Sequence, residues 1–295
     1  MTIQLSTAQK LQQEIQRNVR SAIEEDCGTP EGSGDWTAML LPAQQVRQAH
    51  IISREAAVLC GQAWFEACFR QLDPEFQITW NVEEGGRLEP NSVVCEFTGK
   101  TRALLTAERP ALNFLQTLSG VATKTRAYAS AVAGTHAVVM DTRKTLPGLR
   151  LAQKYAVRVG GGANQRIGLY DGILIKENHV AAAGGITAAL DAAQALNAGV
   201  SIQVEVETLQ QLHEALAWGV KLVLLDNFSL DQIREAVRIN AGRAQLEVSG
   251  GVELEGLREI AKTGVDRISI GSLTKHVQAV DFSMRLVAET VTGDR

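Results

Sequence analysis

Beyond residue 135 the chain repeats one pattern: a short apolar run of strand length, then a longer stretch with apolar residues at helical spacing. The runs are HAVVM (136–140), GILI (172–175), SIQVEV (201–206), KLVLL (221–225), AQLEV (244–248) and RISI (267–270). Near-continuous apolar strands that alternate with helices are typical of a buried parallel sheet. Capping boxes are predicted at the start of two of the helices, formed by Thr208 with Gln211 and by Ser229 with Gln232. The pattern is compatible with a barrel or with an open doubly wound sheet.

Polar residues or glycines lie at the carboxyl end of every one of these strands, which favours the barrel. They begin at Asp141, Lys176, Glu205, Asp226, Ser249 and Gly271. In a barrel the carboxyl ends of the strands meet at one mouth, where barrel enzymes hold their substrates. Since six strands are recognisable rather than eight, the sequence predicts an α/β fold with an incomplete (β/α) barrel.

The first 110 residues follow a different pattern and predict an α+β unit with a small antiparallel sheet. The expected elements are helices at about 6–24, 55–72 and 108–132, and strands at 76–80, 93–97 and 101–106. We therefore place an N-terminal α+β domain at 1–115 and the barrel at 116–280. A last helix over 281–295 is expected to pack with the N-terminal domain.

Composition narrows the class of protein. A chain of 295 residues with a net charge of −4 is unlike a dedicated nucleic-acid binder, which usually carries a large basic face. The four cysteines form no CxxC pair, and no pair of histidines completes a zinc pattern, so reduced thiols are expected. The polar N-terminus is not a signal peptide, and no apolar run approaches the roughly 20 residues of a membrane span. A soluble cytoplasmic protein with no membrane or nucleic-acid partner follows.

Positive charge is nevertheless concentrated between Asp141 and Lys176, next to the triple glycine 160–162. The spacing of Arg150, Lys154 and Arg158, four residues apart, predicts a solvated face of a helix. That explanation does not suit Arg143, Lys144 and Lys176, which directly follow buried strands; Arg166 lies nearby, after the glycines. Because a buried cation is costly unless an anion meets it, these four residues predict a pocket for a ligand with several negative groups.

Acids and glycines complete the predicted mouth. Glu205 and Asp226 could hold Mg²⁺ with substrate oxygens, bond sugar hydroxyls or stabilise a developing cation, or they could form salt bridges with the cations. Glu207 shares a face with Glu205, so the two cannot be separated by alternation.

The stretches 249–251 and 271–273 could bind a phosphate or could be tight turns. His179 is the histidine expected nearest the mouth. These residues predict an enzyme for a phosphorylated, multiply anionic substrate with Mg²⁺, and leave the reaction open.

Several long motifs in order resemble the quinolinate phosphoribosyltransferase family. They are ERPALNFLQTLSGVAT (108–123), DTRKTLPGLR (141–150), GGG (160–162), GLYDGILIKENH (168–179), VEVET (204–208), LLDNF (224–228), LEVSGG (246–251) and IGSLTKHV (270–277). The resemblance implies an N-terminal α/β sandwich domain and an incomplete α/β barrel. It also implies a homodimer in which one subunit's N-terminal domain caps the partner's barrel mouth, giving shared active sites.

The reaction implied by the resemblance joins quinolinate to phosphoribosyl pyrophosphate with Mg²⁺. Its products are nicotinate mononucleotide, pyrophosphate and CO₂, in de novo NAD biosynthesis. Arg109 would reach quinolinate from the partner subunit, and Thr142, Arg143, Lys144, Arg166 and Lys176 would contact carboxylate and phosphate groups. Glu205 and Asp226 would meet ribose hydroxyls and Mg²⁺ and, with Lys144, would be catalytic. Ser249, Gly250, Gly251, Gly271, Ser272 and Leu273 would bind the 5′-phosphate.

One position departs from the family pattern. The family usually has Asn-His-Arg after the glycines, whereas this chain has Asn164, Gln165 and Arg166. Glutamine cannot become a cation, so Gln165→His is expected to change activity by less than about tenfold, or 1.4 kcal/mol. The departure keeps two alternatives open: a related transferase for another heterocyclic acid, and a non-catalytic protein that binds a phosphorylated metabolite.

Overall fold

The structure, a computed structural model, describes residues 7–287, and their contacts divide the chain into two units. The first unit holds the described residues up to 123, together with 147–160 and 277–287. The second holds 124–146 and 161–276. Helix α3 (Thr101–Ala131) begins in the first unit and ends in the second. The contiguous division at 115 and 280 therefore differs from the division by contacts, which moves the segment 147–160 into the first unit.

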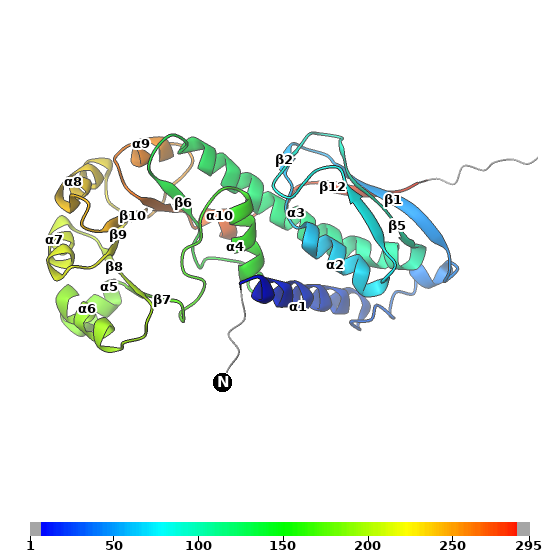
Figure 1. Cartoon of the computed structure of the whole chain (residues 1–295), viewed down its shortest axis with the longest axis horizontal. Coiled ribbons are helices and arrows are strands. Elements are labelled where there is room, and N and C mark those ends of the chain that lie inside the picture. The colour runs from blue at the N-terminus through cyan, green and yellow to red at the C-terminus, as the bar shows by residue number, and fades with distance from the viewer. Residues whose placement is uncertain (1–6, 288–295) are drawn as a thin grey trace, which may run out of the picture. The chain divides into compact units, whose positions relative to one another are not determined.

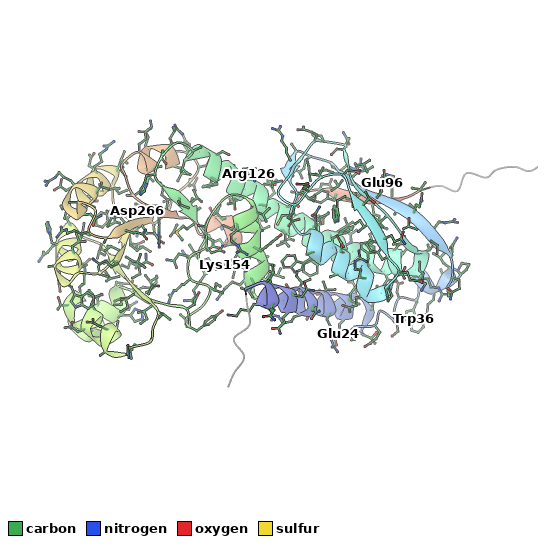
Figure 2. The ribbon with its side chains drawn as sticks, viewed as in Figure 1. Glu24, Trp36, Glu96, Arg126, Lys154 and Asp266 are labelled. Atoms are coloured by element: carbon green, nitrogen blue, oxygen red, sulfur yellow. The ribbon has the colours of Figure 1, made fainter. Side chains whose placement is uncertain are left out.

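The first unit is built on a four-stranded antiparallel sheet in the order β12-β1-β5-β3. Its strands are β1 (Val46–Ser53), β2 (Ala57–Val58), β3 (Gln77–Trp80), β4 (Arg87–Leu88), β5 (Val93–Lys100) and β12 (Phe282–Leu286). Its helices besides α3 are α1 (Thr7–Cys27), η1 (Ala38–Leu40), α2 (Gln62–Leu72) and α4 (Arg150–Val159). Helices α2 and α3 pack on one face of the sheet (Figure 1), and the opposite face carries polar residues such as Glu96 (Figure 2).

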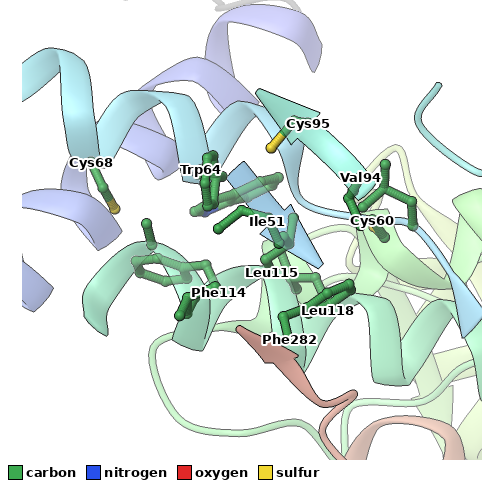
Figure 3. Packing of buried hydrophobic residues seen from close by; sticks show 14 of the residues in the cluster. Ile51, Cys60, Trp64, Cys68, Val94, Cys95, Phe114, Leu115, Leu118 and Phe282 are labelled. Carbon is green, nitrogen blue, oxygen red and sulfur yellow. The ribbon is translucent and has the colours of Figure 1, made fainter. Parts of the chain in front are cut away.

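Aromatic rings and thiols fill the core of this unit (Figure 3). The Phe69 ring lies 4.9 Å from Phe65, 4.8 Å from Phe76 and 5.1 Å from Phe97, measured between ring centroids. The four cysteines are free, as the sequence predicted, and the structure shows that all four are buried. Burial raises the pKa of the Cys68 and Cys95 thiols well above the usual range, so these groups stay protonated and act as small apolar side chains.

The second unit is a six-stranded parallel sheet in the order β6-β11-β10-β9-β8-β7. Its strands are β6 (Val138–Met140), β7 (Gly172–Ile175), β8 (Ser201–Val206), β9 (Leu222–Asp226), β10 (Gln245–Ser249) and β11 (Arg267–Ser269). Its helices are α5 (Glu177–Ala183), α6 (Ile186–Ala195), α7 (Leu209–Trp218), α8 (Leu230–Asn240), α9 (Leu257–Ala261) and α10 (Ser272–Lys275). Helices α6, α7 and α8 lie outside the strands (Figure 1). The six strands and the incomplete barrel predicted from the sequence are confirmed.

Local signals in the sequence set the helix ends of the second unit. Ser229 and Gln232 form the predicted capping box at the start of α8. At α7 only half of the box forms: Thr208 Oγ1 accepts from Gln211 N, but the Gln211 side chain accepts from Glu207 N. Gly219 ends α7 in the left-handed conformation that glycine tolerates best.

Four further predictions about local structure are wrong. Residues 101–106 form the first turns of α3 rather than a strand. The predicted helix over 55–72 begins only at Gln62. In place of a helix over 281–295, residues 282–286 form β12, which pairs with β1 of the first unit, and 288–295 lie outside the described residues. Lys154 (Figure 2) is 2% exposed, so it does not belong to a solvated face of α4.

Candidate active site

The carboxyl ends of the six parallel strands surround one pocket of about 440 Å³ in the second unit. Each strand contributes residues at or just beyond its end. The predicted residues that line the pocket are Thr142, Lys144, Lys176, Glu205, Asp226, Ser249, Gly250, Gly251, Gly271 and Ser272. The structure thus brings together ten of the predicted site residues from loops that are far apart in the sequence.

The turn after β10 needs glycine for two reasons. Gly250 has a φ of +102°, which other residues rarely adopt, and a Cβ there would lie 2.2 Å from Asn227 Oδ1. Asn227 is held by its own backbone, because its N–H donates to Ser249 O at 3.1 Å. Its Nδ2 donates to Asp226 Oδ2 at 2.7 Å. Gly250 therefore lets the turn after β10 approach the end of β9.

The turn after β11 makes room for Lys144. A Cβ at Gly271 would lie 3.0 Å from Lys144 Cδ, so a larger residue would displace this lysine. The backbone at Lys144 is fixed on both sides: its N–H donates to Thr142 Oγ1 at 3.1 Å, and its carbonyl accepts from Thr274 Oγ1 at 2.8 Å. The loop after β6 is thereby anchored on α10, and the lysine is directed along the pocket wall.

Acids and cations meet across the same pocket. Lys176 Nζ lies 3.4 Å from Glu205 Oε2. Burial raises the pKa of the Glu205 carboxyl, Lys176 opposes this shift, and the negative charge of Asp226 adds to it. Glu205 is 8% exposed, whereas Glu207 is exposed beyond the end of β8. The structure therefore separates the two acids that alternation could not.

Arg143 and Arg166 are not among the residues that line this pocket, but they lie close enough to influence each other. Burial lowers the pKa of Arg166, and the charge of Arg143 lowers it further. Arg166 Nη1 donates to Gly172 O at 2.9 Å. Two guanidinium groups held near each other are suited to an anion with more than one carboxylate or phosphate group.

Three other predicted residues lie elsewhere. Arg109 is exposed on α3 in the first unit. Leu273 is buried in the apolar core of the second unit and does not line the pocket. His179 does not line it either: its Nδ1 accepts from Lys176 N at 3.0 Å and so helps to begin α5.

Sequence reasoning missed several residues that line the pocket: Asn227, Val252, Glu253, Ser269, Ile270, Lys275 and His276. Asn227 could have been noticed because it follows Asp226 directly at a strand end. Lys275 and His276 follow the second glycine turn, and their direction depends on how short α10 is. Lys124, on α3, also belongs to this region, since its Nζ donates to Ser272 O at 2.8 Å.

The acids of the pocket suit a hard cation. Clusters of three or more His, Cys, Asp and Glu side chains placed to hold a metal are absent from residues 7–287. Glu205 and Asp226 are two carboxylates at one pocket, and Mg²⁺ commonly binds one or two carboxylates together with substrate oxygens and water. The donor set therefore fits Mg²⁺ that is held jointly by protein and substrate, rather than a metal site made by protein alone.

Comparisons with known proteins agree with this geometry. The family model for the quinolinate phosphoribosyl transferase N-terminal domain matches residues 35–119, and the model for its C-terminal domain matches residues 121–285. The chain belongs to the quinolinate phosphoribosyltransferase family. Every residue that lines the 440 Å³ pocket falls within the match to the C-terminal model.

Relatives in this family are similar along most of their length. The chain is 42% identical to a nicotinate-nucleotide pyrophosphorylase (carboxylating) of Mycobacterium leprae, over 91% of this chain and 95% of that protein. It is 41% identical to a probable enzyme of the same name from Bacillus subtilis, over 86% and 88% of the two chains. Among solved structures, the nicotinate-nucleotide pyrophosphorylase of Francisella tularensis superposes with a TM-score of 0.89 at 44% identity, covering 94% and 97%.

Within residues 7–287, no helix is both long enough and apolar enough to cross a bilayer.

Proposed function

We propose that this protein is a decarboxylating quinolinate phosphoribosyltransferase. It transfers phosphoribosyl from phosphoribosyl pyrophosphate to quinolinate, and it releases pyrophosphate and CO₂ to give nicotinate mononucleotide for NAD biosynthesis. The observation that carries the proposal is the pocket at the six strand ends, which gathers three lysines, three carboxylates and two glycine turns in a member of this family.

The 440 Å³ pocket is the proposed site for the phosphoribosyl group. The turns 249–251 and 271–273 supply backbone N–H groups for the 5′-phosphate, and Gly250 and Gly271 keep this wall free of side chains. Lys144 and Lys176 neutralise the pyrophosphate that leaves. Glu205 and Asp226 bond the ribose hydroxyls, which is consistent with their places on adjacent strands.

Arg143 and Arg166 are the proposed site for the two carboxylates of quinolinate, with Thr142 beside them. The argument is one of charge and shape, because a planar guanidinium group binds a carboxylate through two parallel hydrogen bonds. Burial lowers the pKa of Arg166, the repulsion from Arg143 lowers it further, and a dianion would relieve that repulsion. Arg109 would add a third cation to this site from a second subunit.

The side chains of the pocket suit this chemistry. The pyridine nitrogen forms a bond to the anomeric carbon of the ribose while the bond to pyrophosphate breaks, and positive charge develops on the ribose. Glu205 and Asp226 stabilise that charge, whereas Lys144 and Lys176 stabilise the negative charge on the leaving group. The nitrogen is then cationic, and its charge stabilises the electron pair left on the neighbouring ring carbon when the adjacent carboxylate departs as CO₂. A proton from water adds to that carbon to give nicotinate mononucleotide. The protein acts mainly through position and fixed charge.

Mg²⁺ is the proposed cofactor, and Glu205 and Asp226 would hold it together with substrate oxygens. When bound, it supplies a positive charge that neutralises the pyrophosphate.

We further propose that the protein is a cytoplasmic homodimer with shared active sites. Mixing Arg109→Ala with Lys144→Ala subunits tests the sharing. Regained activity, at up to about a quarter of the wild-type value for random pairing, is expected if each site takes Arg109 from the partner.

The decisive experiment is an assay of pyrophosphate release with quinolinate, phosphoribosyl pyrophosphate and Mg²⁺, and identification of the nucleotide product. Turnover that requires all three is expected. A folded protein that uses nicotinate in place of quinolinate would be a transferase for another ring acid. Binding of phosphoribosyl pyrophosphate without any turnover would instead indicate a metabolite-binding protein, and either result would overturn the proposal.

A further inference from the structure

Residues 163–166 connect the two edge strands of the parallel sheet. Ala163 pairs with Met140 of β6, and its N–H donates to Val139 O at 2.8 Å. At the other edge, Arg166 Nη1 donates to Gly172 O, at the start of β7. The segment therefore holds together the side of the barrel at which β6 and β7 do not pair with each other.

Gln165, in the middle of this segment, directs its side chain into the barrel interior. Its Nε2 donates to Gln203 Oε1 at 2.9 Å and to Glu247 Oε1 at 3.1 Å. Gln203 Nε2 donates to Glu247 Oε2 at 3.0 Å, and Ser269 Oγ also donates to Glu247. Gln203, Glu247 and Ser269 are all buried. These four residues form a polar network that joins the loop to β8, β10 and β11.

This network lies directly beneath the pocket. Gln203 and Glu247 precede Glu205 and Ser249 by two residues on the same strands, so each pair shares a face and differs in depth by about 7 Å. Ser269 belongs both to the network and to the pocket lining. The network and the pocket lining are therefore adjacent layers of the same barrel.

The contacts also fix how the amide of Gln165 is oriented. Its Oε1 accepts from Arg166 N at 2.9 Å, while its Nε2 faces the Glu247 carboxylate, which accepts hydrogen bonds when ionised. The backbone of the same residue is anchored as well, because Gln165 N donates to Asp141 Oδ1 at 2.9 Å. The amide thus binds the main chain of Arg166 at one end and the barrel interior at the other.

We propose that Gln165 is a positioning residue for the ring-acid site: it holds Arg166 in place through its amide and acts without contacting the substrate. The inference rests on the proposed function, in which Arg166 binds a carboxylate. A histidine in this place can accept from Arg166 N and donate to Glu247 only while it is neutral. Glutamine does both at every pH, so the position of Arg166 does not depend on pH.

The charged groups around this side chain come from three places. Glu247 reaches it from β10, Asp141 binds its backbone from the end of β6, and Arg166 follows it in the chain. Strands β8 and β11 contribute the neutral side chains of Gln203 and Ser269. A protonated imidazole at 165 would therefore be stabilised by two acids and would lose its acceptor for Arg166 N.

The test compares Gln165→Met and Gln165→His by calorimetric binding of phthalate, an aromatic dicarboxylate, and by steady-state kinetics. Gln165→Met keeps the length but loses the hydrogen bonds, so we expect the Kd for phthalate and the KM for quinolinate to rise about tenfold. The kcat and the KM for phosphoribosyl pyrophosphate should stay within about twofold. Gln165→His should bind phthalate almost normally at pH 8.5 and about tenfold more weakly at pH 6.5, whereas the wild type should not show this loss.

A matched control is Asn240→Ala, which removes a buried amide that bonds Ala244 elsewhere in the same unit. It should lower the Tm and leave all four constants unchanged. Normal phthalate binding by Gln165→Met, or a fall in kcat at constant KM, would overturn the proposal. If Gln165→Met fails to fold, the pH comparison with Gln165→His decides, and equal binding at both pH values overturns it. If phthalate binding depends on Gln165 but the protein does not use quinolinate, the proposed function is refuted. The positioning role of Gln165 would then still hold.

Discussion

Some buried polar side chains of the two units serve different purposes. In the first, Asn18 Oδ1 accepts from Trp64 Nε1, Ser119 Oγ accepts from Cys60 N, and Asp73 accepts from Lys100 N, so these groups satisfy donors within the core. In the second, Glu205 faces a pocket and Glu247 lies one layer beneath it.

This difference has an energetic consequence. A buried polar group that satisfies a backbone or indole N–H removes a penalty from the folded state. A buried charge at a pocket keeps part of its desolvation cost until a ligand meets it, as the raised pKa of Glu205 indicates. We therefore expect substitutions in the first unit to affect mainly stability, and substitutions at the pocket to affect mainly activity.

The largest expected effect on stability is in the aromatic core. Phe69 is fully buried among Phe65, Phe76 and Phe97. Phe69→Ala removes these contacts and leaves a cavity, so the free energy of unfolding should fall by about 3–5 kcal/mol. Urea unfolding measures this loss. Phe69→Leu, which keeps more of the volume, should lose clearly less, and both variants should keep the wild-type KM values while folded. A raised KM in the folded Phe69→Leu protein would contradict the separation of the two units.

The largest expected effect on activity is at Lys144, which lines the pocket between Thr142 and Gly271. Lys144→Met keeps the chain length and removes the charge, so kcat/KM should fall about a hundredfold to a thousandfold. The Tm should change little, because the lysine is exposed. Lys221→Met, at an exposed lysine just before β9, is the matched control and should keep full activity. A loss of less than about threefold for Lys144→Met would show that this charge is not used in the reaction.

An intermediate effect is expected at Gly250, where both properties should change. Gly250→Ala adds a Cβ that clashes with Asn227 Oδ1, at a φ of +102°. The strain should lower stability by about 1–3 kcal/mol, and the displaced turn should raise the KM for phosphoribosyl pyrophosphate. Gly242→Ala is the matched control, because Gly242 also has a positive φ, +78°, but nothing lies within 4 Å of the added Cβ. It therefore separates backbone strain from the clash with Asn227. Equal KM values in the two variants would remove Gly250 from the proposed phosphate site.

Much of the second unit could be predicted because its strands are short, apolar and followed at once by polar residues. The first unit was harder. β1 mixes polar and apolar residues, and β12 is recognisable only by its pairing with β1, more than 200 residues earlier in the chain. The β-branched residues of 101–106 suggested a strand, but the segment continues into α3 without a break.

The candidate site could be predicted as far as strand ends determine it. Lys144, Lys176, Glu205 and Asp226 were found in this way, since parallel strands deliver their ends to one edge. The direction of the Gln165 side chain could not be predicted, because a loop residue is oriented by partners on β8 and β10 rather than by its neighbours in sequence. The burial of Lys154 is a similar case, because spacing along a helix does not show what packs against it.

The smallest expected effect is on stability, at Glu108 of the first unit. Unlike the buried polar groups described above, its partly buried charge is expected to lower stability. Burial raises the pKa of the Glu108 carboxyl, and the neighbouring Arg109 opposes the shift. The folded state therefore binds this proton more tightly than the unfolded chain, so the stability is greatest below the ordinary carboxyl pKa, about 4.3, and falls as the pH rises toward the raised value. Glu108→Gln should then have a slightly higher Tm than the wild type at pH 7 and an equal Tm well below pH 4.

The matched control is Glu24→Gln, the same substitution at an exposed position of α1 (Figure 2). A pH-dependent gain for Glu108→Gln would mean that α3 holds a charge at some cost in stability beside Arg109, the residue proposed to enter the partner's site. The first unit would then contain both a structural core and a part of α3 that is proposed to contribute to the active site. An equal Tm difference at pH 7 and below pH 4 would show that Glu108 ionises freely, and α3 near Arg109 would follow the rest of the first unit.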